Sequence, residues 1–272
     1  MKKVESEQKP SIQELEEIET IPVEEQNVVF RPNEGPQTEF LAAPEREVLY
    51  GGSAGGGKSY AMLADPLRYM GHPSFSGLLL RHTTEELREL IFKSKELYPQ
   101  IWKGIKWSER KMQWEAPSGA RLWMSYLDRD DDVLRYQGLA FSWIGFDELT
   151  QWSTPYAWNY MRSRLRSTAQ DLPVYMRATT NPGGPGHQWV KKMFIDPAPY
   201  GKTFDATNIE TGKPLKYPDN HERAGEALFQ RRFIPAKLFD NPYLSAQGDY
   251  EAMLLSLPEH QRKQLLEGDW DI

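Results

Sequence analysis

Short apolar runs alternate with amphipathic stretches along most of the chain. Four runs are rich in aliphatic and aromatic residues and end at turn-forming residues, which is typical of buried strands: 45–50, 76–81, 139–148 and 172–182. Between them, apolar residues recur at helical spacing in 58–70, 83–98 and 155–167. Strands that alternate with helices form parallel sheets covered on both faces. The pattern therefore predicts an α/β fold with a mostly parallel central sheet flanked by helices.

Local signals refine the ends of these elements. Thr83 or Thr84 is a suitable N-cap for the helix at 83–98, because its hydroxyl can accept a hydrogen bond from the first turn. Pro155 suits the first turn of the helix at 155–167, where no backbone N–H is needed.

The remaining segments are expected to be a hairpin, an irregular region and a helical end. Residues 110–127 predict a hairpin around the sequence PSG. Residues 183–232 are rich in Gly, Pro and Asn, and within them 208–217 is a further candidate hairpin. Residues 243–267 have helical spacing that is interrupted at Pro258.

Charge is distributed unevenly along the 272 residues. The formal net charge is −6, but residues 1–27 alone contain eight Glu and three Lys. We therefore expect 1–30 to be an acidic, flexible segment and the folded remainder to be almost neutral. The absence of cysteine excludes disulfides and thiolate metal sites. No apolar run approaches the roughly 18–20 residues of a membrane span, so an intracellular chain without a membrane partner is expected.

A glycine-rich turn follows the first predicted strand. The sequence LYGGSAGGGKSYAML (49–63) has five glycines in seven residues, followed by Lys58 and Ser59. Gly52, Gly57, Lys58 and Ser59 match the phosphate-binding loop G-x-x-x-x-G-K-[ST], in which backbone N–H groups surround phosphates. In such loops the lysine reaches the β- and γ-phosphates and the hydroxyl binds Mg²⁺. A glycine-rich surface turn is the alternative interpretation.

A pair of carboxylates ends the apolar run WIGFDEL. Its position about 90 residues after the glycine-rich turn fits a Walker B element. Asp147 would bind Mg²⁺, and Glu148 would orient or deprotonate the attacking water. The alternative is a helix cap, since acidic residues favour a first helical turn. The acidic pair favours a hydrolase over a kinase, and no N-K-x-D motif for guanine is present.

A third motif is the sequence ATTNPGGPGHQWV (178–190). A strand that ends in Thr and Asn beside the γ-phosphate could sense hydrolysis, and the glycines after it would permit the loop to move. An ordinary exit from a strand into a loop is the alternative interpretation, because Asn-Pro and Gly-Gly are common there.

These motifs together resemble the ATPase domain of the large terminase subunit of tailed bacteriophages, the motor that packages DNA into procapsids. The resemblance covers about residues 34–272. It depends on the following segments: PQTEFLAAPEREVLYGGSAGGGKS, LLLRHTTEEL, RYQGLAFSWIGFDELTQW, SRLRS, TTNPGGPGHQWV and DNPYLSAQGDYEAMLLSLPEHQRKQLLEGDWD. It implies a P-loop NTPase of the additional-strand, RecA/helicase-like type with a small C-terminal helical lid.

The resemblance also implies roles for individual residues. Gln37 matches a glutamine that helps to read adenine, and Thr179, Thr180 and Asn181 match a motif that couples hydrolysis to movement. The metal ligands would be Ser59 and Asp147, and Glu148 would be catalytic. The expected nucleotide-binding residues are Gln37, Gly52, Ser53, Ala54, Gly55, Gly56, Gly57, Lys58, Ser59 and Tyr60.

Additional positive charge is expected at the γ-phosphate. An arginine finger is worth about 10³–10⁵ in rate, and in large terminases it is thought to come from a neighbouring subunit of a ring. Arg135 is the first candidate for this trans finger, and Arg162, Arg164 and Arg166 are the next candidates. Each of them could instead be a solvated arginine or a contact to a DNA phosphate.

The resemblance predicts the organisation and partners of the chain. We expect an acidic segment at 1–30, an ATPase core at 31–232 and a helical lid at 233–272. Family members usually continue into a nuclease domain. This sequence ends at EGDWDI, where that domain would begin, so no DNA cleavage by these residues is expected.

The expected function is ATP hydrolysis with Mg²⁺ that drives double-stranded DNA into a procapsid. The expected partners are DNA, the portal protein, the small terminase subunit and further copies in a ring, with a monomer as the alternative in isolation. The expected location is the host cytoplasm, with transient docking on the procapsid and no place in the mature virion. The alternatives are a helicase-like ATPase and a DNA-binding scaffold that uses its nucleotide site for stability.

Overall fold

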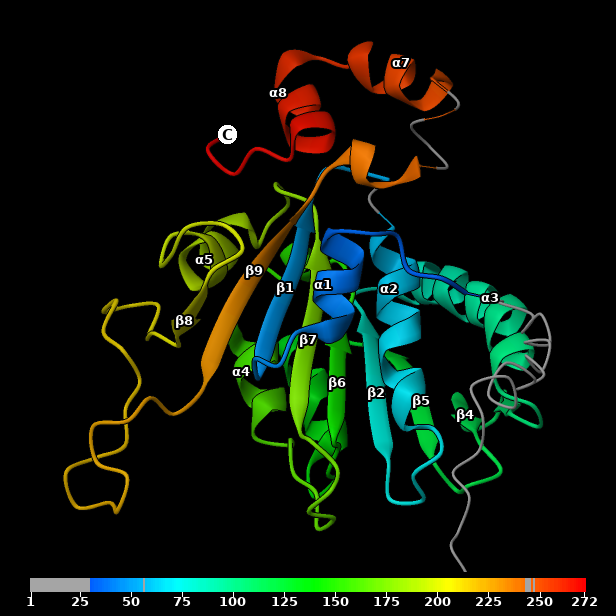
Figure 1. Ribbon diagram of the computed structural model, residues 1–272, viewed down its shortest axis with the longest axis vertical. Coiled ribbons are helices and arrows are strands. Elements are labelled where there is room, and N and C mark those ends of the chain that lie inside the picture. Colours follow the sequence, from blue (N-terminus) through cyan, green and yellow to red (C-terminus); the bar gives the residue numbers. More distant parts are fainter. Residues whose placement is uncertain (1–29, 56, 243–245, 247) are drawn as a thin grey trace, which may run out of the picture. The chain divides into compact units, whose positions relative to one another are not determined.

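A nine-stranded mixed sheet is the centre of the computed structural model (Figure 1). The structure describes residues 30–55, 57–242, 246 and 248–272, and residues 32–272 form one unit. The strand order is β3-β4-β5-β2-β6-β7-β1-β9-β8. The neighbours from β5 to β9 are parallel, whereas β3, β4 and β8 pair antiparallel at the two edges. The strands are β1 Glu47–Gly52, β2 Ser76–Arg81, β3 Lys106–Ser108, β4 Gln113–Glu115, β5 Arg121–Tyr126, β6 Trp143–Phe146, β7 Tyr175–Thr180, β8 Thr203–Asp205 and β9 Gln230–Ala236.

Helices cover both faces of this sheet (Figure 1). The α-helices are α1 Pro36–Ala42, α2 Lys58–Ala64, α3 Thr84–Ile101, α4 Tyr156–Arg162, α5 His187–Val190, α7 Asp249–Leu255 and α8 Glu259–Arg262. Short 3₁₀ and π turns are η2 Asp65–Tyr69, η3 Asp130–Tyr136, η4 Leu149–Gln151, η5 Lys191–Ile195, η6 Leu238–Asp240 and η7 Lys263–Glu267. Within the described ranges, no helix has both the length and the apolar character needed to span a membrane.

The alternation of side chains along β5 shows how the two layers are separated. Met124 lies on the side of α3, where its sulfur is 3.7 Å from the Ser94 hydroxyl oxygen. Trp123 points to the opposite face and packs edge-on against Phe141, with ring centroids 5.4 Å apart. The larger apolar core lies on that opposite face and includes α4 and α5. A smaller cluster under α1 includes Phe40 and Tyr50. Because β5 has an apolar residue on each face, it separates the two layers.

Most predicted elements are confirmed, including the four strands and the hairpin, which is β4–β5. Thr83 is the N-cap of α3 in a capping box. Its hydroxyl accepts from the Glu86 N–H at 3.3 Å, and the Glu86 carboxylate accepts from the Thr83 N–H at 3.2 Å. The helix predicted for 58–70 begins at Lys58 but changes to a 3₁₀ turn at Asp65. Pro66 explains this change, because it has no N–H to continue an α-helical ladder.

The end of the chain differs most from the prediction. Strand β9 was not predicted, and the expected boundary between residues 232 and 233 falls inside it, so the sheet continues into the expected lid. The candidate hairpin at 208–217 is a turn closed by one isolated bridge, between Thr207 and Pro214, rather than by a ladder, and a second bridge joins Lys216 to Ala227. Helices α7 and α8 confirm the helical pattern and the break at Pro258. Residues 1–29, 243–245 and 247, which include most of the expected acidic segment, lie outside the described residues.

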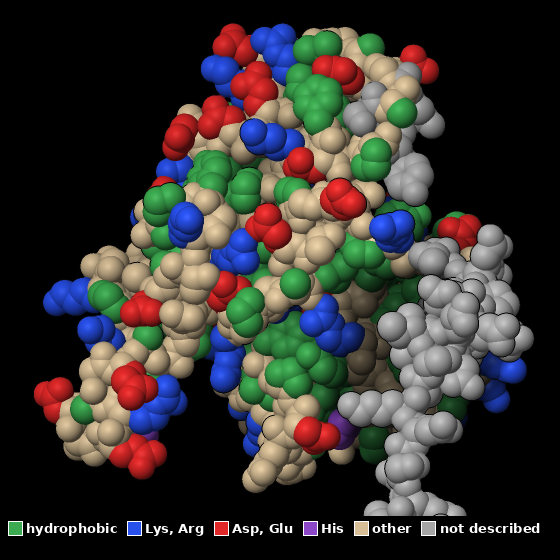
Figure 2. Space-filling view, viewed as in Figure 1, with side chains coloured by type: hydrophobic (Ala, Val, Ile, Leu, Met, Phe, Trp, Pro, Cys, Tyr) green, Lys and Arg blue, Asp and Glu red, His purple; other side chains and the backbone are tan. Residues whose placement is uncertain are grey.

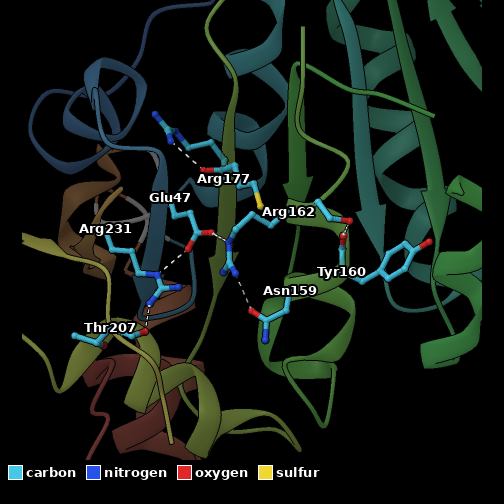
Figure 3. Close-up of polar contacts among 9 residues, drawn as sticks. Glu47, Asn159, Tyr160, Arg162, Arg177, Thr207 and Arg231 are labelled. Atoms are coloured by element: carbon cyan, nitrogen blue, oxygen red, sulfur yellow. Dashed lines mark hydrogen bonds and ion pairs between the residues drawn. The ribbon is translucent and has the colours of Figure 1, made fainter. Parts of the chain in front are cut away.

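A buried carboxylate joins β1, β9 and α4 at the amino ends of the strands (Figure 3). Glu47 is fully buried and pairs with the guanidinium groups of Arg162 and Arg231, the latter at 2.7 Å. Arg231 also donates to the Thr207 carbonyl at 2.8 Å, and Arg162 donates to Asn159 at 3.1 Å. Burial alone would raise the pKa of the Glu47 carboxyl, but the charges of Arg231 and Arg162 outweigh it and lower the pKa. Glu47 is therefore held ionised inside the fold.

Replacement of this carboxylate should strongly destabilise the fold. Glu47→Gln leaves two guanidinium groups without their counter-charge, and loss of one partner of a buried pair costs about 3–5 kcal/mol of unfolding free energy. Urea unfolding at neutral pH measures this loss. Glu39→Gln is the matched control, because Glu39 is half exposed where it pairs with Arg232 and such pairs contribute about 0–1 kcal/mol.

The difference in unfolding free energy between wild type and Glu47→Gln should depend on pH. Because the folded-state pKa of Glu47 is lowered, its stabilisation is present above the ordinary Glu pKa and is lost as the pH falls through the folded value. The gap between wild type and Glu47→Gln should therefore narrow in acid. Two outcomes would contradict this account of the buried pair. One is an equal loss of unfolding free energy in Glu47→Gln and Glu39→Gln, and the other is a loss in Glu47→Gln that does not change with pH.

Candidate functional site

The three predicted motifs meet at one edge of the sheet. Strand β7 lies between β1 and β6, and all three run parallel. The glycine-rich turn begins at the end of β1, and the acidic pair follows β6. The Thr-Thr-Asn motif consists of the last two residues of β7 and the residue after them. Ligands of open α/β sheets bind at this edge of the strands. The parallel register therefore assembles one site from three motifs, of which the first and the last are more than 100 positions apart.

The backbone of the glycine-rich turn requires glycine at two described positions. Gly57 has φ +75°, and a Cβ atom there would lie 2.8 Å from the Gln37 amide nitrogen. Gly52 has φ +142°, and a Cβ atom there would lie 2.1 Å from the Ala236 carbonyl oxygen. A side chain at either position would clash or strain the chain. Gly56, which was also predicted to bind nucleotide, lies outside the described residues.

Neighbouring segments hold the turn in place. The N–H of Ser53 donates to the Ala236 carbonyl at 2.8 Å, and the N–H of Ala54 donates to the Leu265 carbonyl at 2.6 Å. On the opposite side, the Gly55 carbonyl accepts from the Asn241 side chain at 2.6 Å. The turn is therefore supported by β9, by residues that follow it and by the C-terminal segment.

Gln37, the residue predicted to help to read adenine, contacts the glycine-rich turn. It is buried in α1, and its amide nitrogen donates to the Gly57 carbonyl at 2.9 Å. Its amide oxygen accepts from the Asn33 N–H at 2.6 Å. Gln37 therefore joins α1 to the glycine-rich turn, and its role in reading adenine stays a prediction.

Lys58 is a buried cation at the first position of α2. Only 6% of the residue is exposed, and its ammonium donates to the Ser53 carbonyl at 2.6 Å. Burial lowers the pKa of this ammonium, and the nearby carboxylates of Glu148 and Asp147 oppose the shift. Within the described ranges, no carboxylate lies within ion-pair distance of it. A buried cation without a paired anion is costly, so this position is suited to an anionic ligand.

Asp147 follows β6 and is fully buried. One of its oxygens lies 2.7 Å from the Arg81 guanidinium nitrogen, and the other accepts a hydrogen bond from the Thr179 hydroxyl. Arg81 ends β2, the strand next to β6, so two neighbouring strand ends fix the carboxylate. Sequence reasoning missed Arg81. Its one signal was an arginine at the end of an otherwise apolar strand.

Glu148 has an unusual backbone conformation. Its φ of +62° lies in the left-handed region, which non-glycine residues rarely adopt, and such strain is concentrated at functional sites. Burial raises the pKa of its carboxyl, and the adjacent Asp147 charge adds to this effect. The backbone of Asn181 acts in the opposite direction and lowers this pKa, but the two raising effects outweigh it. Glu148 is therefore a half-buried carboxylate with a raised pKa, which suits a group that accepts a proton.

The Thr-Thr-Asn motif connects the two acids to the loop after β7. The Thr180 hydroxyl is 2.7 Å from the Thr150 hydroxyl, directly behind the acidic pair. The Asn181 side-chain oxygen is buried and has no hydrogen-bond partner among the described residues. Thr180 therefore braces the segment after Glu148, while Asn181 leaves one acceptor free beside the Glu148 carboxyl.

The donor set fits a magnesium ion that is completed by phosphate oxygens. Ser59 follows Lys58 in the first turn of α2 and is partly buried, and Asp147 follows β6, which β7 separates from β1. In the described residues, no group of three or more His, Asp or Glu side chains could hold a metal by itself. Mg²⁺ is commonly bound by few protein oxygens together with substrate phosphates. The predicted pair, Ser59 and Asp147, is compatible with that arrangement. The side chain of Tyr60, the next predicted residue, is 43% exposed.

The predicted arginines are in different environments. Arg135, at the end of η3, is 44% exposed and donates to the Tyr126 carbonyl at 3.0 Å. Arg162 is engaged by Glu47 at the amino ends of the strands (Figure 3). Arg164 lies over the Tyr160 ring, and Arg166 donates to the Gly138 carbonyl at 3.3 Å. Of these candidates, Arg162 is the one whose charge is already neutralised in a buried pair.

Comparison with known proteins identifies the family of this fold. A family model described as phage terminase large subunit matches residues 45–221, which is more than half of the chain. A search of curated proteins found no match.

Solved structures with the same fold support this match. The large terminase of a thermophilic bacteriophage aligns with a TM-score of 0.62 and 16% identity, over 88% of this chain and 53% of that one. The complex of that terminase with ATP-gamma-S aligns with a TM-score of 0.61 and 15% identity, over 88% of this chain and 53% of that one. The large terminase ATPase domain of Thermus phage P74-26 aligns with a TM-score of 0.54 and 13% identity, over 89% of this chain and 94% of that one. The chain thus spans about half the length of the first of these proteins.

Proposed function

This chain belongs to the phage terminase large subunit family, and we propose that it hydrolyses ATP to drive double-stranded DNA into a procapsid. The observation that carries the proposal is Lys58, a buried ammonium at the glycine-rich turn that lies opposite two carboxylates without pairing to either. A triphosphate supplies the missing negative charge at this position.

Each side chain of the site has a role in this proposal. Lys58 binds the β- and γ-phosphates, and the backbone N–H groups of the turn surround them. Ser59 and Asp147 would hold Mg²⁺, which supplies positive charge to the phosphates when bound. Arg81 and Thr179 keep Asp147 oriented. Glu148 would accept the proton of the attacking water, and the side-chain oxygen of Asn181, which has no hydrogen-bond partner among the described residues, would help to orient that water.

The wider assembly is part of the same proposal. Family membership supports DNA as the polymer that is moved, with the portal protein and the small terminase subunit as partners. Copies of this chain would form a ring on the portal in the host cytoplasm, with transient docking on the procapsid. Arg135 would act as the finger between neighbouring copies, because it is exposed and its hydrogen bonds go to Tyr126 and Asp132.

Lys58→Ala tests the proposal. The substitution should abolish ATP hydrolysis and weaken ATP binding, because the phosphates lose their main side-chain partner. Turnover is measured by phosphate release, and affinity is measured with a fluorescent ATP analogue. Lys93→Ala is the control, since Lys93 pairs with Glu89 on α3 and should not affect either quantity.

Stability provides a second measurement on the same variant. Lys58→Ala removes a buried charge that has one carbonyl partner, so the fold should persist with an unfolding midpoint near that of wild type. A folded Lys58→Ala protein with wild-type turnover would overturn the phosphate-binding assignment.

A further inference from the structure

Two cavities lie side by side along β5 on the face opposite α3. The larger, of about 680 Å³, includes Arg121 and Arg166, and the smaller, of about 290 Å³, includes Lys111 and Arg135. Both are lined by Trp123 and Leu139, so they form one depression, which we call the β5 groove. The larger cavity lies toward the amino end of β5 and the smaller toward its carboxyl end, so the groove follows a strand between β2 and β4 (Figure 1).

The charge of the groove is of one sign. Its lining contains four basic residues and no acidic residue among those that the structure describes. The cavity at the amino end of β1 differs, because its lining mixes Glu45, Asp205 and Glu226 with Arg46 and Arg223. The face shown in Figure 2, which carries α1 and α2, also has acidic and basic side chains interspersed. The β5 groove is therefore a local basic site on a chain whose net charge is negative.

The four basic groups are not equivalent. Lys111 is 2.7 Å from the Glu115 carboxylate, and Arg135 is 3.3 Å from the Asp132 carboxylate, so both are partly neutralised. Arg121 and Arg166 form no ion pair with a described carboxylate. Arg121 lies over the Trp123 ring at 5.2 Å, and Arg166 donates to the Gly138 carbonyl. Glu115 lies opposite Arg121 on β4, and the charge of Arg121 helps to lower the pKa of the Glu115 carboxyl. Arg166 therefore supplies most of the uncompensated charge of the groove, and Arg121 supplies part of it.

The remaining lining is suited to a phosphodiester backbone. Hydroxyl groups contribute to many contacts with phosphate oxygens, and the larger cavity is lined by Ser74, Ser76, Ser142, Ser167 and Thr168. The stretch of β5 from Arg121 to Ser125 measures roughly 13 Å at the usual rise of a strand. Successive phosphates of one DNA strand are about 3.4 Å apart along the helix axis, so this length matches about four of them.

We propose that the β5 groove binds the phosphate backbone of DNA through Arg121 and Arg166. This proposal rests on the proposed function, because it takes double-stranded DNA as the polymer that the chain handles. It assigns the contact to two arginines that have no part in the proposed nucleotide site. The contact would be independent of base sequence, since phosphates carry none.

The test is the salt dependence of duplex binding by the full chain. Arg121→Gln/Arg166→Gln should bind a fluorescent duplex on the order of 10- to 100-fold more weakly at about 0.1 M salt, because two phosphate contacts are lost. The slope of the logarithm of affinity against the logarithm of salt concentration should decrease by about 1.8. Fluorescence anisotropy measures both quantities, and the unfolding midpoint confirms that the variant is folded.

Two controls make the result specific. Lys213→Gln/Lys216→Gln removes the same charge from exposed positions of the 203–228 segment and should retain most of the affinity and the slope. Arg121→Lys/Arg166→Lys retains the charge and should restore most of the binding. An equal loss in the two Gln pairs, or a wild-type chain that does not bind a duplex, would overturn the groove as a DNA site.

The outcome is distinguishable from failure of the proposed function. ATP turnover and its loss in Lys58→Ala are measured without DNA and do not depend on the groove. Saturable binding of a glutamate-rich peptide together with wild-type duplex binding in Arg121→Gln/Arg166→Gln would instead identify the groove as a site for an acidic protein segment, and would also overturn the proposal.

Discussion

Glu148→Gln is expected to bind ATP with near wild-type affinity and to lose turnover by about 10²–10⁴-fold. The amide has the same shape as the carboxylate and can occupy the same left-handed backbone position, but it cannot accept a proton from water. The pKa of the Glu148 carboxyl is raised by burial and by the Asp147 charge, so a basic group lies at this point, on a residue with an unusual backbone conformation. Single-turnover phosphate release, together with equilibrium nucleotide binding, separates the two effects.

Asp147→Asn is the control that divides the roles of the two acids. This substitution removes the charge that pairs with Arg81 and that would bind Mg²⁺. It should therefore raise the Mg²⁺ concentration needed for half-maximal ATP binding, whereas Glu148→Gln should not. Identical metal titrations for the two variants would contradict the division.

Arg135→Ala should lower assembled ATPase activity by about 10³–10⁵-fold and leave nucleotide affinity almost unchanged. The guanidinium would contact charge that develops in the transition state, so its loss affects the rate rather than binding. In the isolated chain its hydrogen bonds and its ring contact go to η3 and the end of β5. Wild-type specific activity should therefore rise with protein concentration or on a portal, and Arg135→Ala should not show that rise.

Mixing two inactive proteins tests whether the finger acts between subunits. An Arg135→Ala subunit keeps its own Glu148, and its Glu148→Gln neighbour still supplies Arg135. Part of the activity should therefore return in the mixture. The absence of recovery, under conditions where wild type assembles, would assign the role to an arginine of the same subunit. Arg81 is then the first candidate, because it already lies 2.7 Å from Asp147.

The motifs that could be predicted from the sequence are those whose chemistry is local. The glycine-rich turn needs glycine at positions with positive φ, and these glycines lie close together in the sequence, where they can be recognised. The Thr83 cap and the strand before Asp147 are likewise set by near neighbours. The parallel strand arrangement then follows from the alternation of elements, which brings the loops after β1, β6 and β7 to one edge.

The features that were missed depend on partners far along the chain. Strand β9 was not predicted because it contains Arg231, a charged residue that is not typical of a buried strand. Arg231 is buried because Glu47, 184 positions away, supplies its counter-charge. The sequence around Arg81 is that of an ordinary strand end. Its contact with Asp147 depends on the pairing of β2 with β6. The hydrogen bond between Ala54 and Leu265 joins the turn to the end of the chain through backbone atoms. Such a bond does not depend on the side chains, so the sequence does not predict it.

The position of β9 beside β1 has a consequence for how the site forms during synthesis. The glycine-rich turn emerges early from a ribosome, but its supporting carbonyl at Ala236 follows 183 residues later. At about 5–20 residues per second, this delay is roughly 10–40 s. Until then β1 has an unpaired edge, and pairing over such a separation is slow compared with local helix formation. A nascent chain therefore contains every nucleotide-binding motif well before it has a surface that can bind nucleotide.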